Sequence, residues 1–124
     1  VQTPPHAVAQ AAAGVALALQ SPLIVAFTMS GTTALRISRA RPPLPILALT
    51  PSEQVARQLA LVWGTVSGKA DTAANYEQSI DTAKQAATKT GLTTTGNQIV
   101  IVSGFPFATR GSTNNLRVAE VGLE

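Results

Sequence analysis

A small, hydroxyl-rich turn follows an apolar run in the first third of the chain. It reads Ser-Gly-Thr-Thr from Ser30 to Thr33, and Thr28 adds a hydroxyl two residues earlier. Glycine lets a backbone approach a ligand closely, and the free N–H groups at the start of a helix face outward. Such a turn suits a phosphate. The same hydroxyls can instead cap their own helix, and composition alone leaves the two interpretations about equal.

A second loop, near the C-terminus, has a similar composition and adds a cation. It contains Arg110, Gly111, Ser112 and Thr113, between two predicted strands. A guanidinium group donates paired hydrogen bonds to phosphate oxygens and keeps its charge at every physiological pH. If the strand order brings both loops to one edge of a sheet, they can close over one phosphorylated ligand.

Short apolar runs predict the strands that would carry these loops. Runs rich in β-branched residues are typical of strands buried on both faces, and they occur at Leu23–Phe27, Pro45–Leu49 and Gln98–Val102. Leu61–Val66 is a weaker strand candidate because Gly64 interrupts it. The run Leu116–Val121 follows the previous strand after a loop too short for a parallel crossover, which predicts an antiparallel neighbour.

Helical patterns separate most of these strands. Ala7–Leu19 consists mainly of strong helix formers and is apolar nearly all round, so we expect its own sheet and another domain or subunit to cover it. Thr50 is the expected cap of a second helix, with Pro51 first and Glu53 closing a capping box. A third helix is expected to end at Gly91, with an apolar stripe formed by Tyr76, Ile80, Ala83 and Ala87.

This alternation predicts one α/β domain over residues 1–124. We expect a three-layer sandwich with a five-stranded mixed sheet, four strands parallel and the last antiparallel, flanked by about five helices. A chain of 124 residues with 45% hydrophobic content can bury a single core. Val1 is not an initiator methionine, and Leu123 and Glu124 resemble the start of a tag linker, so we interpret the chain as a fragment.

Residues for catalysis or metal binding are scarce. His6 is the only histidine and stands beside two prolines, there is no cysteine, and Glu77 and Asp81 are best interpreted as a solvated helix face. Gly64–Ala70 resembles a P-loop, but it has three residues between its glycines where four are required. We therefore expect no catalytic residue, no metal ligand and no cofactor in this chain.

Other classes of partner are disfavoured. Arg36, Arg39, Arg41 and Arg57 could form a basic face, but the aromatic content is 4% and no nucleic-acid motif surrounds them. Ala7–Leu19 is too short to span a bilayer. The absence of cysteine fits a reducing cytoplasm, which is the location we expect.

Taken in order, the segments resemble one known family. "TMSGTTALRISRARPPLPILALT", "QVARQLALVWGTV", "GNQIVIVSG" and "GSTNNLRV" closely resemble the C-terminal domain of pyruvate kinase, over nearly the whole chain. The residues that match the family's pattern are Thr28, Ser30, Gly31, Ser38, Arg39, Arg41, Pro42, Thr50, Ala56 and Arg57. The chain departs at Ala40, where an aromatic residue is common.

The resemblance implies regulation. In this family phosphoryl transfer from phosphoenolpyruvate to ADP occurs in a separate N-terminal barrel, which would hold the Mg and K ions and is absent here. The C-terminal domain binds a sugar-phosphate or nucleotide activator in many members and forms one subunit interface of the tetramer. Carried over, the phosphate would lie on Thr28, Ser30, Gly31, Thr32 and Thr33, with the loop Arg110, Gly111, Ser112 and Thr113 folding over it. The apolar Ala7–Leu19 helix would rest on the barrel.

The resemblance also bears on the effector. Members activated by a bisphosphate are expected to carry an additional arginine on the long helix before the fourth buried strand, and Tyr76–Ala83 contains neither arginine nor lysine. Two phosphates need two clusters of donors. We therefore expect a monophosphate, such as a hexose or pentose phosphate or AMP. The alternative is a stand-alone ligand-binding domain of the same fold with no kinase attached.

Overall fold

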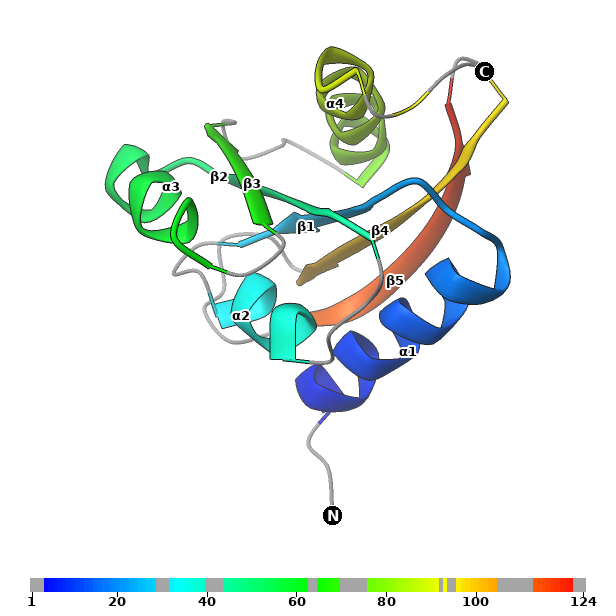
Figure 1. Cartoon of the computed structure of the whole chain (residues 1–124), viewed down its shortest axis with the longest axis horizontal. Coiled ribbons are helices and arrows are strands. Elements are labelled where there is room, and N and C mark those ends of the chain that lie inside the picture. The colour runs from blue at the N-terminus through cyan, green and yellow to red at the C-terminus, as the bar shows by residue number, and fades with distance from the viewer. Residues whose placement is uncertain are drawn as a thin grey trace.

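Five strands form one mixed sheet in a computed structural model that describes residues 4–28, 32–39, 44–62, 65–69, 76–91, 93, 96–104 and 113–121. The strand order is β3-β2-β1-β4-β5 (Figure 1). The strands are β1 (Ile24–Phe27), β2 (Ile46–Thr50), β3 (Thr65–Lys69), β4 (Gln98–Gly104) and β5 (Thr113–Glu120). The described helices are α1 (Pro4–Ala18), α2 (Thr32–Arg39), α3 (Glu53–Leu59) and α4 (Tyr76–Lys89).

The directions of the strands confirm the predicted mixed sheet. β1 is parallel to both β2 and β4, and β3 is parallel to β2. β5 runs antiparallel to β4, with Val118 opposite Val100. The four parallel strands are joined by helices, because a parallel connection has to cross back over the sheet. The predicted α/β class is therefore confirmed, with four helices in the described residues where about five were expected.

Alternating side chains of the strands build a core on each face of the sheet. Ile24 of β1 packs with α1 and α2 on one face, and the next residue, Val25, packs in the cluster that contains α4 residues on the other. α3 joins the first face, where Leu59 packs with Ala34 of α2 and with Ala48 of β2. Figure 1 shows α1 and α2 on the side of the sheet opposite α4. Buried strands sandwiched in this way explain the continuous apolar runs in the sequence.

Helix α1 lies on the sheet through a stripe of alanines. Ala9, Ala12 and Ala16 are all buried, and they belong to one core cluster with residues of β1, β2 and β4. Leu17 and Leu19, by contrast, are 60% and 39% exposed. The expectation that the sheet covers this helix is confirmed. The predicted contact of α1 with another domain or subunit is not tested by a single chain and stays a prediction.

Replacing Ala12 with leucine should lower the free energy of unfolding by about 1–3 kcal/mol. Ala12 is fully buried between α1 and the sheet, so a larger side chain has to push the helix outward. Urea denaturation followed by circular dichroism measures the change. Ala11→Leu is the matched control, because Ala11 is exposed on the same helix and leucine is an excellent helix former. Equal stability of the two variants would contradict this packing.

The predicted start of α3 is wrong by two residues. Ser52, not Thr50, is the N-cap, and its Oγ accepts a hydrogen bond from the N–H of Val55 at 3.3 Å. Thr50 remains in β2 because it still pairs with Lys69 of β3, which extends the ladder to the end of both strands. Its Oγ1 accepts a hydrogen bond from the N–H of Ser52 at 3.2 Å and so holds the strand-to-helix turn.

The weak strand predicted over Leu61–Val66 also begins later than expected. β3 starts at Thr65, while Leu61 lies in the turn after α3 and is 90% exposed. The reason is local hydrogen bonding at the end of the helix. The N–H groups of Leu61 and Val62 donate to the carbonyl oxygens of Gln58 and Leu59, at 3.3 and 3.0 Å, and are therefore not available to a strand.

The long helix α4 agrees with its predicted stripe and end. Ile80, Ala83 and Ala87 are buried in one core cluster, as the spacing requires. The helix ends at Lys89, and Gly91 then adopts a φ of 75°, a left-handed conformation typical of a glycine after a helix. The side chain of Tyr76, the fourth predicted member of the stripe, lies outside the described side chains.

Replacing Thr93 with valine should raise the free energy of unfolding by about 1 kcal/mol. Thr93 lies between α4 and β4, is 6% exposed, and its buried Oγ1 has no hydrogen-bond partner. Valine has nearly the same shape and removes the desolvated hydroxyl. Thr90→Val is the control, because the Thr90 hydroxyl donates to the carbonyl oxygen of Ala87 at 2.6 Å. Thermal denaturation should show a gain for Thr93→Val alone; a loss in both variants would refute the prediction.

Candidate functional site

The carboxyl ends of β1 and β4 lie side by side, at the end of the sheet where the parallel strands finish. The hydroxyl-rich turn and the Arg110 loop begin there. Ala26 of β1 lies opposite Val102 of β4, so the residues that follow both strands emerge together. β5 starts at Thr113, which lies opposite Gly104 at the end of β4. The connection between β4 and β5 thus leaves and re-enters the sheet at this edge. We call it the carboxyl edge.

The carboxyl edge also contains the point at which the order of the sheet reverses. From β1 the chain builds outward through β2 to β3, and it then crosses back to place β4 on the other side of β1. In open α/β sheets, ligands bind outside the carboxyl ends of the strands at such a reversal. α2 begins here at Thr32, which directs the N–H groups of its first turn toward the edge.

The described residues include part of the predicted phosphate turn. Thr28 is 6% exposed, and its N–H donates to the carbonyl oxygen of Leu49 at 2.9 Å, which continues the β1–β2 ladder past Phe27. Thr32 and Thr33 form the first turn of α2, with their side chains outside the description. Ser30 and Gly31 lie outside the described residues. The predicted role of the turn therefore stays a prediction.

The predicted effector loop is described only at its C-terminal end. Thr113 is the first residue of β5, and its backbone pairs with Gly104. Arg110, Gly111 and Ser112 lie outside the described residues. Their predicted contact with a phosphate is thus untested by the structure, whereas the strand ends that flank the loop are placed at the carboxyl edge.

Two further hydroxyl residues lie at the carboxyl edge and were not predicted as part of a site. Thr50 is completely buried at the end of β2, and Ser103 is 1% exposed in β4. Both follow directly on apolar strand runs, as Thr28 does, and this is the sequence signal that could have identified them. The hydrogen bond from Ser52 gives Thr50 a structural role in its turn.

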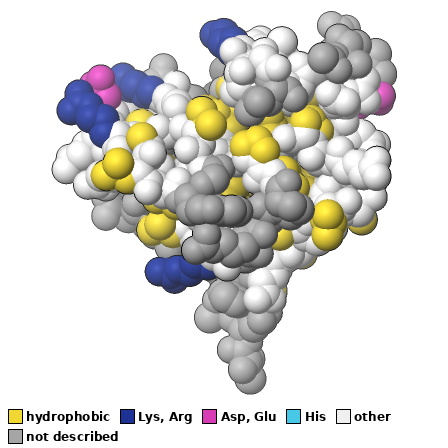
Figure 2. All heavy atoms as spheres, viewed as in Figure 1, with side chains coloured by type: hydrophobic (Ala, Val, Ile, Leu, Met, Phe, Trp, Pro, Cys, Tyr) yellow, Lys and Arg dark blue, Asp and Glu magenta, His cyan; other side chains and the backbone are white. Residues whose placement is uncertain are grey.

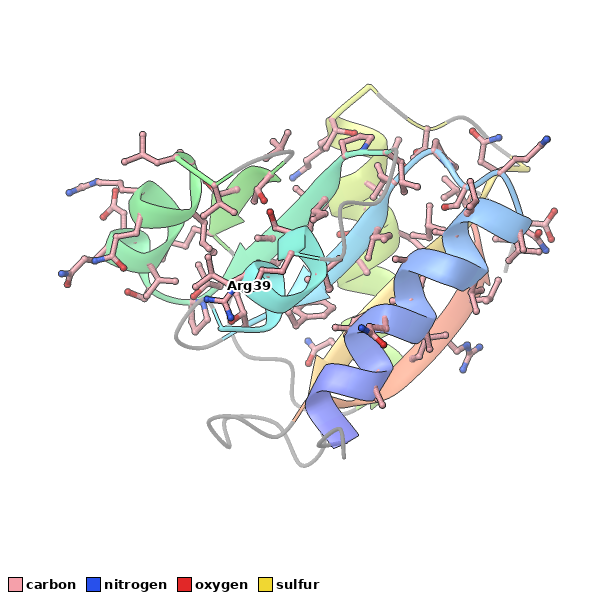
Figure 3. The ribbon with its side chains drawn as sticks, turned by 60° about the horizontal axis from the view of Figure 1, so that its bottom comes forward. Arg39 is labelled. Atoms are coloured by element: carbon pink, nitrogen blue, oxygen red, sulfur yellow. The ribbon has the colours of Figure 1, made fainter. Side chains whose placement is uncertain are left out.

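Charged side chains in the described part of the chain are dispersed. Arg39, labelled in Figure 3, is the last residue of α2, at the opposite end of that helix from Thr32. Arg57 pairs with Glu53 at 3.4 Å on the exposed side of α3. Figure 2 shows separate Lys and Arg side chains on the face of the molecule seen in Figure 1, rather than one continuous basic patch. This arrangement gives no support to a nucleic-acid surface among the described residues.

Two other kinds of feature, a metal-binding cluster and a membrane-spanning helix, are absent from the described ranges. No three residues of the types His, Cys, Asp and Glu gather there in a way that could hold a metal ion. None of the helices described is long and apolar enough to cross a membrane. α1, the most apolar helix by sequence, has 15 residues.

Comparison with known proteins gives a consistent result. A family model described as pyruvate kinase, alpha/beta domain, matches residues 6–119. A pyruvate kinase of Agrobacterium vitis is 72% identical over 120 residues, which cover 97% of this chain and 25% of that enzyme. A pyruvate kinase of Geobacillus stearothermophilus is 39% identical over 112 residues, which cover 90% of this chain and 19% of the enzyme.

These relatives are much longer than the region they share with this chain. A second pyruvate kinase of Agrobacterium vitis is 61% identical over 120 residues, again 97% of this chain and 25% of the enzyme. The chain thus spans about a quarter or less of the length of these relatives. The family model nevertheless covers nearly all of it, from residue 6 to residue 119. The chain therefore belongs to the family of pyruvate kinase C-terminal α/β domains.

Proposed function

We propose that this chain is the regulatory domain of a pyruvate kinase and binds a phosphorylated effector at its carboxyl edge. The observation that carries the proposal is the parallel pairing of β1 with β4. This pairing brings Thr28, which follows β1, to the same edge as Gly104 and Thr113, which flank the connection between β4 and β5, although about eighty residues separate the two segments in the sequence.

The residue types at this edge supply the donors that a phosphate needs. The N–H groups at the start of α2 and the hydroxyls of Thr32 and Thr33 would hold the phosphate oxygens, and Gly31 would allow the backbone to approach. Arg110 would add a fixed positive charge from the facing loop. A dianion held by backbone dipoles and one guanidinium needs no metal ion.

The first half of α4 favours an effector with one phosphate. α4 leads from the carboxyl end of β3 back to the amino end of β4, so its N-terminal half lies nearer the carboxyl edge. That half, Tyr76–Ala83, contains Glu77 and Asp81 but neither lysine nor arginine. This segment therefore offers no lysine or arginine to a second phosphate. Hexose phosphates, pentose phosphates and AMP are the candidate effectors.

The remainder of the proposal concerns the whole enzyme. The catalytic part would transfer the phosphoryl group of phosphoenolpyruvate to ADP in the cytoplasm, with its Mg and K ions, and this domain would contribute to subunit contacts in a tetramer. An effector activates an enzyme only through its differential affinity for two states. A site in a domain that also forms subunit contacts is well placed to bias two quaternary arrangements.

The test is a ligand panel on the intact protein that contains this domain. Glucose 6-phosphate, ribose 5-phosphate, AMP, fructose 1,6-bisphosphate and sulfate are each added during thermal denaturation. A ligand at about a hundred times its Kd should stabilise the protein by roughly 2.7 kcal/mol. We expect one monophosphate to give a clear shift that Thr33→Ala removes.

Lys89→Ala is the control variant for this panel. Lys89 ends α4 at the amino ends of the strands, on the far side of the sheet from the proposed site. It should therefore keep the full ligand-induced shift. If the ligand still raises the melting temperature of Thr33→Ala, the ligand binds elsewhere on the protein. Tight binding of the bisphosphate with no preference for monophosphates would refute the assignment of the effector class.

A further inference from the structure

We draw no further inference here: the strongest candidate, the apolar side chain of Val66 that the edge strand β3 exposes to solvent, carries nothing because nothing in the structure shows what covers it.

Discussion

Replacing Ile101 with alanine should lower the free energy of unfolding of this chain by about 3 kcal/mol. Ile101 lies in β4, is 1% exposed, and packs in the cluster that holds Ile80 and Ala83 of α4. β4 is hydrogen-bonded on both sides, to β1 and to β5, so the backbone cannot move inward to fill the space left by the lost carbon atoms. The residual cavity adds to the lost burial.

Urea denaturation followed by circular dichroism measures this change in the free energy of unfolding. In thermal denaturation, the melting temperature should fall by roughly 10 °C. Leu61→Ala is the control, because Leu61 is 90% exposed and surface substitutions usually change stability by less than about 0.5 kcal/mol. An Ile101→Ala variant as stable as the control would mean that α4 does not pack on the sheet as described.

Replacing Arg110 with alanine should weaken the binding of the monophosphate effector by about 10- to 100-fold. A hydrogen bond to a charged group contributes about 1.5–3 kcal/mol. Arg110 is the only arginine between Gly104 and Thr113, the loop proposed to face the phosphate. Arg110→Lys keeps the charge but loses the paired donors, so its affinity should fall between those of the alanine variant and the unmodified protein.

Isothermal titration of the intact protein gives the affinities of all three forms. The melting temperature of each variant without ligand checks that its fold is unchanged. If both Arg110 variants bind the effector as tightly as the unmodified protein, the connection between β4 and β5 does not contribute to the site, and the account would have to rest on the α2 turn alone.

The α/β class and the directions of the strands could be predicted from local chemistry. The runs around Ile24, Ile46 and Val100 are continuous because parallel strands are buried on both faces, and the short loop before β5 excludes a parallel crossover. The resemblance to the pyruvate kinase family was carried by motifs in a fixed order, and the family model confirms it over residues 6–119.

Boundaries that depend on tertiary pairing were less predictable. Thr50 has the properties of a helix cap, yet it stays in β2 because Lys69 of β3 lies opposite it. No local rule shows where a neighbouring strand ends. Leu61 and Val62 have strand-like side chains, but the carbonyl oxygens at the end of α3 bind their N–H groups. The hydroxyls of Thr50 and Ser103 become part of the carboxyl edge only once β1, β2 and β4 are adjacent.

The candidate site was predictable as two loops, and the strand order shows that both start from the same edge. The chemistry of Ser30 or Arg110 follows from residue type, whereas the shared edge at which β1 and β4 end depends on β4 lying beside β1 rather than beside β3. Nothing in the sequence between residues 70 and 97 fixes that choice locally. It results from the return of the chain across the sheet through α4.

The most direct test of the account is to map effector binding on this 12.8 kDa chain by amide chemical shifts. Ribose 5-phosphate or glucose 6-phosphate is titrated to the concentration that saturates the intact protein. The account predicts shifts at Thr32, Thr33 and Thr113, with Gly91 and Gly96 at the opposite edge unchanged. Unchanged amides at the carboxyl edge, or shifts confined to the opposite edge, would contradict it.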